Sequence, residues 1–300
     1  MIDSRPYMWL IAGCIMLGVI LVCGVATLAV SSDRTFSYDI RQLADLHGDQ
    51  CEKPRSKSSV VEPANAWSNL AYMLAGILIL LRARSLPGIL FGANLCALAL
   101  FSGFYHATLK GLPQIMDVAW VYAALFSAIL FGVYTLLRAF GVELWWWLWT
   151  ILVIFLDILG LLIRRSFGWD STVVFIVLVV LMTLILIGII ITSAVQGKVA
   201  RQFGADYGWW YLSLELLGVA AIAGVGFMFR LGDGYAKDSR GNIVENFLCN
   251  PDSIVQSHAL WHILSAAALL LAYDLFTQFQ SGNDIARPDQ PTVLPSLSSS

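Results

Sequence analysis

Residues 171–194 read STVVFIVLVVLMTLILIGIIITSA, an apolar run without a single charged side chain. A helix needs roughly 20 apolar residues to cross the hydrocarbon core of a bilayer, so this run is long enough to span a membrane. The chain as a whole is 58% hydrophobic and 13% charged, with a mean hydropathy of +0.75. These values exclude an ordinary soluble domain.

Similar apolar runs on both sides of this segment predict eight membrane-spanning helices in total. Each run is continuously apolar, whereas the strands of a transmembrane β-barrel would alternate between apolar and polar residues. We therefore expect an all-α, polytopic integral membrane protein. The predicted helices cover residues 8–30, 65–82, 87–107, 116–139, 144–164, 171–194, 209–230 and 256–276.

These helices divide the chain into four parts. Residues 1–35 carry the first helix, residues 36–64 form a polar loop, and residues 65–280 contain the other seven helices. Residues 281–300 have the polar composition of a disordered tail. The first run could instead be a cleaved signal peptide, but its length and its lack of a small-x-small cleavage site favour a retained helix.

Lysine and arginine residues in the short loops indicate the orientation, because such residues accumulate on the cytoplasmic side. With Met1 inside, the inside loops hold more of them than the short outside loops do. Both termini are then cytoplasmic, and the long loops 31–66 and 231–255 face outward. Cys51 and Cys249 lie one in each outward loop, where a disulfide is allowed if that side is periplasmic or lumenal. The inside residues are Arg82, Arg84, Arg138, Lys198 and Arg201, and the outside residues are Lys110, Arg164 and Arg165.

Three of the four histidines lie at the outward ends of predicted helices. His106 ends the third helix, and His258 and His262 open the last one, four residues apart on one helix face. Ser102 lies one turn before His106, and Asp117 follows the next turn at the outward start of the fourth helix. Polar groups are costly inside a bilayer, so this gathering at one depth requires a reason.

The side chains suit a zinc-dependent hydrolase. Three imidazoles can hold Zn²⁺ and leave one position open for water. A carboxylate such as Asp117 can carry the proton of that water, and a hydroxyl such as Ser102 can donate to the oxyanion of a tetrahedral intermediate. A single interfacial histidine is more often simply hydrogen-bonded, and an intrahelical serine often bonds its own backbone. The combination on one side of the membrane favours the metal site.

A second polar cluster precedes the second helix. Asp49, Glu52 and Glu62 are carboxylates in a loop rich in carbonyl groups, a composition that suits a hard cation such as Ca²⁺. The alternative is a solvated acidic loop in which Asn65 or Ser68 caps the helix. Within the apolar runs, Asp157 and Glu215 could each contact the site, pack against a neighbour or contact substrate. The sequence contains no basic patch, so no nucleic-acid partner is expected.

Taken together, Ser102, His106, Asp117 and the His258-Ala-Leu-Trp-His262 motif resemble the alkaline ceramidase family. This family belongs to a wider group of seven-helix membrane metallohydrolases that includes the adiponectin and progestin receptors. Cys51-Glu52 and the Glu62 to Asn69 block also resemble the ceramidase pattern, so the likeness runs from about Asp49 to Asp274. Gln50 and Pro54 depart from it, where the family usually has Trp and Asn.

The resemblance implies seven core helices around a zinc ion held by His106, His258 and His262. It implies that Ser102 and Asp117 position the attacking water, and that Cys51 and Cys249 form a disulfide. It also implies a calcium site with Asp49, Glu52 and Glu62 as ligands. The first predicted helix is additional to the family's seven.

The sequence therefore predicts a zinc-dependent intramembrane amidohydrolase that cleaves the N-acyl bond of ceramide or a related lipid amide. The expected partner is a membrane lipid, and no protein partner is predicted. The alternatives are a lipid esterase or phospholipase with the same zinc site, and a non-enzymatic receptor that zinc holds together. We expect the chain in a bacterial inner membrane, with the zinc site toward the periplasm.

Overall fold

The computed structural model describes residues 51–55, 60–109, 111–142, 144–167, 171–195, 208–237 and 243–284. These residues are helical except for loops and one short β-hairpin, which confirms the all-α class. The predicted first helix over residues 8–30 lies outside the described residues, as does most of the loop 36–64.

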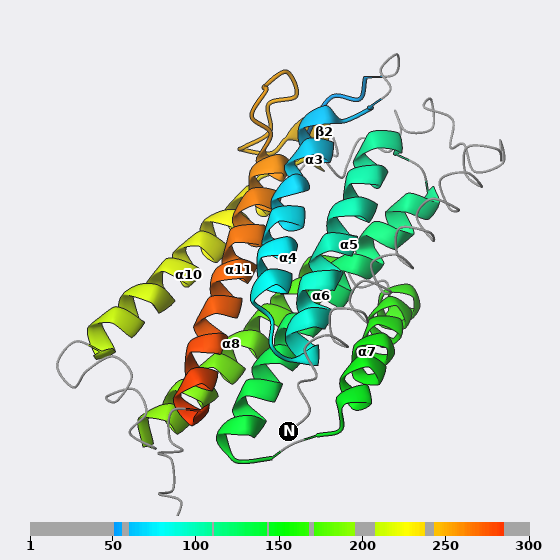
Figure 1. The fold of residues 1–300 in the computed structure, drawn as a ribbon. Helices are drawn as coiled ribbons and strands as arrows, with labels where there is room; N and C mark the ends of the chain where they lie inside the picture. Colours follow the sequence, from blue (N-terminus) through cyan, green and yellow to red (C-terminus); the bar gives the residue numbers. More distant parts are fainter. Residues whose placement is uncertain are drawn as a thin grey trace, which may run out of the picture.

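In the described part of the chain, seven helical segments follow the order that the apolar runs predict (Figure 1). The first segment is broken at Asn69 into two helices. Within the described residues, five segments are long and apolar enough to cross a membrane, and α7 and α8 contain shorter apolar stretches. The helices are α3 (Pro63–Ser68), α4 (Leu70–Arg82), α5 (Leu86–Thr108), α6 (Gly111–Ala139), α7 (Trp146–Phe167), α8 (Ser171–Val195), α10 (Gly208–Leu231) and α11 (Ser257–Asp284).

Two helix ends in the described part of the chain differ from the predicted ones by five residues or more. Helix α6 begins at Gly111 rather than near residue 116, because Pro113 is tolerated in the first turn, where backbone N–H groups have no helical partner. Helix α11 continues to Asp284, so its last residues belong to the segment that composition assigned to the tail. Apolar patterning marks the part of a helix that needs burial, and a helix can extend past it.

The bundle is organised around α5, α6 and α11. Helix α5 packs between α4 and α6, while α11 contacts α3, α4, α6 and α10. Helices α7 and α8 pack mainly against α6. In Figure 1, α3, the hairpin loop and the first turn of α11 lie at the same end of the bundle. The site described below is built at this end.

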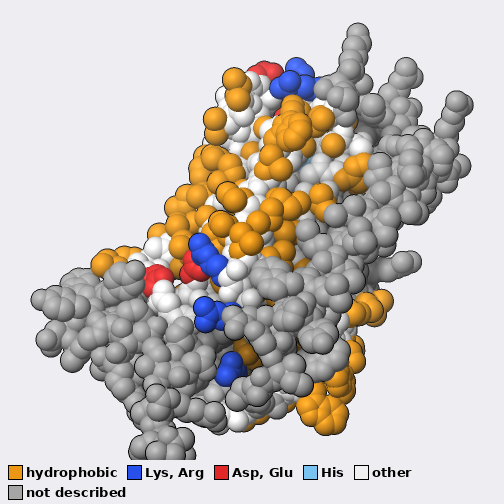
Figure 2. Space-filling view, viewed as in Figure 1, with side chains coloured by type: hydrophobic (Ala, Val, Ile, Leu, Met, Phe, Trp, Pro, Cys, Tyr) orange, Lys and Arg blue, Asp and Glu red, His pale blue; other side chains and the backbone are white. Residues whose placement is uncertain are grey.

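The outer surface of the bundle suits a lipid environment. On the face shown in Figure 2, apolar side chains dominate the described surface between a group of charged side chains at its upper end and a second group in its lower half. Helix α10 exposes many large apolar side chains, among them Leu214, Leu217, Val225 and Met228. In a soluble protein such a surface would be unfavourable, whereas in a bilayer it faces acyl chains.

Near its midpoint, α4 approaches α5 closely. A Cβ atom added to Gly76 would lie 2.6 Å from Sγ of Cys96 and 2.7 Å from the carbonyl oxygen of Gly92. A Cβ on Gly92 would in turn lie 2.9 Å from the carbonyl oxygen of Gly76. Small residues at such crossings let two helix backbones touch, which favours helix association in membranes.

Replacing Gly76 with alanine is therefore expected to destabilise the bundle by about 1–3 kcal/mol, the usual cost of overpacking. The added methyl group would push α4 away from α5, and α4 continues from the helix that carries part of the site. Thermal unfolding of the purified protein in detergent measures the effect. Gly218→Ala in α10 is the matched control, because its Cβ would meet no atom within 4 Å. Equal melting temperatures for the two variants would contradict the close crossing.

A covalent link lies at the site end of the bundle. Cys51 and Cys249 form a disulfide across 198 residues of sequence, with Cα atoms 5.3 Å apart. Between α10 and Cys249 the chain forms an antiparallel hairpin of β1 (Tyr235–Lys237) and β2 (Ile243–Glu245). The disulfide therefore joins the segment before the first helix of the bundle to the loop that leads into α11.

Candidate metal centre

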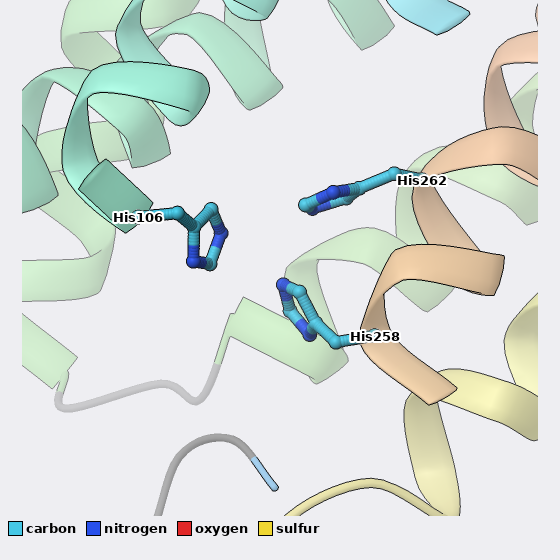
Figure 3. A group of neighbouring side chains, drawn as sticks. All are labelled: His106, His258 and His262. Carbon is cyan, nitrogen blue, oxygen red and sulfur yellow. The ribbon is translucent and has the colours of Figure 1, made fainter. Parts of the chain in front are cut away.

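Three histidines from two helices converge at this end. His106 comes from the last turn of α5, and His258 and His262 come from the first two turns of α11. Each offers a ring nitrogen, and these atoms all lie within 4.8 Å of one another. Figure 3 shows the three rings turned toward a common point. All three residues are buried, with exposed fractions of 0% for His106, 5% for His258 and 1% for His262.

Local structure explains why these side chains meet. Positions four apart on a helix share a face, so His258 and His262 point the same way, with ring centroids 4.6 Å apart. Helix α5 ends just after His106, where Leu109 adopts a left-handed backbone conformation with φ of 49°. The ring of His106 then lies 5.1 Å from that of His258 and 5.3 Å from that of His262, measured between centroids.

The first histidine is held by Glu62. Nδ1 of His106 lies 2.8 Å from Oε2 of Glu62, and the same oxygen accepts a hydrogen bond from Nδ2 of Asn65 at 3.2 Å. The backbone fixes the pair, because the N–H of Glu62 donates to the carbonyl of His106 at 3.0 Å. Burial raises the pKa of Glu62 to about 7. A cation at the imidazoles would favour its ionised form.

The second histidine is held by Asp233, a residue in the loop after α10. Nδ1 of His258 lies 3.0 Å from Oδ2 of Asp233. Burial alone would raise the pKa of this carboxyl, but the hydrogen bonds from His258 and Ser257 hold it below its usual value. Asp233 is therefore an ionised acceptor for the Nδ1–H group of His258.

The third histidine is held by Ser68 at the end of α3. Nδ1 of His262 lies 2.8 Å from Oγ of Ser68. The hydroxyl of Ser68 already donates its only proton to the carbonyl of Asn65, at 2.8 Å. A serine hydroxyl has one proton to donate, so Ser68 accepts at its other contact. It follows that His262 carries its proton on Nδ1.

All three imidazoles are thus held in the same tautomer, with Nδ1 protonated and Nε2 bearing a lone pair. Each Nδ1 has its own acceptor, which leaves the Nε2 atoms to face one another. Nε2 of His106 is buried and has no hydrogen-bond partner among the residues that the structure describes. Three converging lone pairs repel one another unless a cation lies between them, and Zn²⁺ is commonly bound by such neutral imidazoles. The residues present therefore fit a zinc ion.

The predicted acid and hydroxyl lie near this group. Ser102 is buried in α5, one helical turn before His106. Asp117 lies in the first turns of α6, within electrostatic range of His106 and of Tyr72. Tyr72, which the sequence did not suggest, packs against the ring of His262 with centroids 5.7 Å apart, and its hydroxyl contacts Oγ of Ser265 at 2.5 Å.

Of the three predicted calcium ligands, two lie among the residues that the structure describes, and both form hydrogen bonds to other groups of this chain. The carboxylate oxygens of Glu52 accept the backbone N–H groups of Ala64 and Asn65, each at 2.9 Å, so Glu52 caps helix α3. Burial raises the pKa of Glu52, and the two backbone hydrogen bonds oppose that shift. Glu62 contacts His106 as described above, and Asp49 lies outside the described residues. The calcium site stays a prediction.

Two further acidic residues, Glu215 and Asp157, lie within the apolar runs. Oε1 of Glu215 accepts a hydrogen bond from Nε2 of Gln278 at 2.8 Å, which joins α10 to α11. This is the packing contact that the sequence left open for Glu215. Asp157 is partly buried in α7.

Sequence reasoning missed Asp233 and the contact between Ser68 and His262. Asp233 stands between two glycines immediately after an apolar run, at the same end as the histidines, and that placement was the available signal. Ser68 was identified only as a helix cap, because a contact with a residue 194 positions away has no local signature.

A family model described as Ceramidase matches residues 47–294, which include all three histidines, both disulfide cysteines and every helix of the bundle. None of the curated proteins matches the chain. Because the family match covers most of the chain, this protein belongs to the ceramidase family.

Proposed function

We propose that this protein is a zinc-dependent membrane hydrolase that cleaves the N-acyl amide bond of ceramide or a related lipid amide. Water is added across the bond, and the products are a sphingoid base and a fatty acid. One observation carries the proposal: three buried imidazoles have ring nitrogens within 4.8 Å of one another, and each is held through Nδ1 by a different residue. Membership of the ceramidase family supplies the substrate class.

His106, His258 and His262 would hold the zinc ion, which when bound activates water and polarises the scissile carbonyl. Glu62, Asp233 and Ser68 orient the three imidazoles through their Nδ1–H groups. Asp117 would take a proton from the attacking water and deliver one to the leaving amine. Ser102 would donate a hydrogen bond to the oxygen on which charge develops.

The position of the site suits a lipid substrate. The histidines lie at the ends of helices that are apolar over their length, so a lipid in the bilayer could place its polar headgroup there while its chains stay among the helices. We further propose, from the distribution of Lys and Arg, that both termini are cytoplasmic and that the site faces the periplasm of a bacterial inner membrane.

Calcium is a secondary proposal, with Asp49, Glu52 and Glu62 as ligands. Its support is the resemblance of the loop to the ceramidase pattern. Within the described residues, the group of side chains arranged to hold a metal consists of the three histidines. The oxygens of Glu52 and Glu62 are used by α3 and by His106, which makes the support for calcium weaker than that for zinc.

Elemental analysis of detergent-purified protein is expected to find about one zinc per chain, and ceramide hydrolysis should disappear on chelation and return with zinc. Mass spectrometry of the products separates the possible reactions. A sphingoid base supports the amidase, whereas a lysolipid would indicate an esterase or phospholipase on the same metal. Zinc whose removal lowers the melting temperature, in a protein that hydrolyses no lipid, would indicate a receptor. Calcium measured in the same sample tests the secondary proposal.

A further inference from the structure

Asp233 occupies a position that connects three separate parts of the molecule. It is 4% exposed and lies between Gly232 and Gly234, beyond the end of α10. The loop around it is fixed by close packing, because a Cβ on Gly232 would lie 2.6 Å from Cδ1 of Leu248. Nδ2 of Asn246 also donates to the backbone carbonyl of Asp233, at 2.6 Å.

The two carboxylate oxygens of Asp233 serve different partners. Oδ2 accepts the Nδ1–H group of His258 at 3.0 Å. Oδ1 accepts the hydroxyl of Ser257 at 2.7 Å and the backbone N–H of Cys51 at 3.2 Å. Donors from the loop before α3 and from the start of α11 therefore set the orientation of one carboxylate, and this carboxylate sets the orientation of a metal-binding imidazole.

The position of the Cys51 amide depends on the disulfide. Cys51 is 1% exposed and is bonded to Cys249. The other described contact between the Cys51 segment and the loop after Cys249 is the ion pair of Lys53 and Asp252, at 3.9 Å, whose side chains are 73% and 85% exposed. An ion pair that is this exposed contributes little to the stability of the contact. The disulfide and the two hydrogen bonds that anchor the neighbouring Glu52 to the start of α3 therefore act together to keep this N–H group against Asp233.

We propose that Asp233 is a positioning residue through which the Cys51–Cys249 disulfide controls how well His258 binds the metal. The inference rests on the proposed metal site and adds to it a dependence on the oxidation state of two cysteines that contribute no ligand. Opening the disulfide frees the Cys51 amide, the carboxylate loses one of the donors that orient it, and His258 loses its fixed ring orientation. Residues that orient a ligand in this way typically change metal affinity by roughly 10- to 100-fold.

The test uses the full-length protein in detergent, with the metal removed and Co²⁺ as the probe. Affinity is measured by competition with a chelator, and ligand geometry by the visible absorption of bound Co²⁺. Asp233→Asn is expected to lower Co²⁺ affinity by about 10- to 100-fold and to alter the absorption spectrum. Asp252→Asn is the matched control, since this nearby carboxylate is exposed and contacts only Lys53 among the described partners, and it should leave both measurements unchanged.

A double-mutant cycle isolates the coupling. The double variant Cys51→Ser, Cys249→Ser should lower the Co²⁺ affinity of the otherwise wild-type protein. The same two substitutions should not lower the affinity of the Asp233→Asn variant any further. Thermal stability, in contrast, should fall additively, because the disulfide also constrains the unfolded chain. A purely structural role for either group would not produce this difference between the two measurements.

Ser257→Ala provides a milder variant in case Asp233→Asn fails to fold, and a smaller loss of affinity is expected because one donor to Oδ1 is removed. Wild-type affinity and spectrum in both Asp233→Asn and Ser257→Ala would overturn the proposal, as would additive affinity losses in the cycle. A wild-type protein that binds no Co²⁺ would instead overturn the metal site itself, so the two failures are distinguishable.

Discussion

Replacing His262 with alanine is expected to remove zinc from the purified protein and to lower ceramide hydrolysis by more than about 100-fold. Only two imidazoles would then face the metal, and Ser68 would lose the Nδ1–H group that it accepts. Zinc content by elemental analysis and turnover by mass spectrometry measure the two effects. The bundle should persist, because α11 retains its apolar contacts with α4, α6 and α10.

Ile263→Ala is the matched control for this variant. Ile263 is the next residue of α11 and is 44% exposed, so its side chain points away from the histidines. It should keep its zinc and its activity. If purified, zinc-free His262→Ala hydrolysed ceramide at the wild-type rate, the assignment of the site would be wrong.

Replacing Asp117 with asparagine is expected to lower kcat by about 10²- to 10⁴-fold, while zinc content stays at the wild-type level. Asparagine has the shape of aspartate but cannot take a proton from water at neutral pH. Asp117 lies within electrostatic range of His106 without belonging to the group of metal-binding side chains. Measurements of kcat and zinc content on the same sample therefore separate proton transfer from metal binding.

Asp274→Asn serves as the control for loss of a carboxylate in the bundle. Asp274 forms an ion pair with Arg82, at 2.9 Å, far along α11 from the histidines. Its loss should change stability by no more than about 1 kcal/mol, because the pair is partly exposed, and should leave kcat unchanged. If Asp117→Asn also lost its zinc, Asp117 would be part of the metal site; if it kept full activity, another group would carry the proton.

The helices of this protein could be predicted from the sequence because each one is a local feature. An apolar run of about 20 residues in a bilayer can satisfy its backbone hydrogen bonds only as a helix, so the runs 171–194 and 256–276 predict helices without any information about their neighbours. The break at Asn69 and the extension of α11 to Asp284 were not predicted, because apolar patterning marks the part of a helix that needs burial and does not show where the helix breaks or how far it continues.

The three histidines that could hold a metal ion were also predictable from the sequence. His258 and His262 lie one turn apart on the same helix, and His106 ends a run that the membrane places at the same level. A bilayer restricts polar side chains to a few depths, so the spacing of histidines along apolar runs carries information about three-dimensional position. In a soluble protein the same spacing would be much less informative.

The sequence alone thus determined the helical membrane fold and the three imidazoles, since both follow from short-range periodicity combined with the thickness of a bilayer. Only the tertiary structure decided which nitrogen of each ring is free. That choice depends on Glu62, Ser68 and Asp233, which come from two segments outside the histidine-bearing helices and meet them across 44, 194 and 25 residues of sequence. These hydrogen bonds form only when folding brings the distant segments together. No local sequence pattern identifies such partners, so the sequence could not predict them.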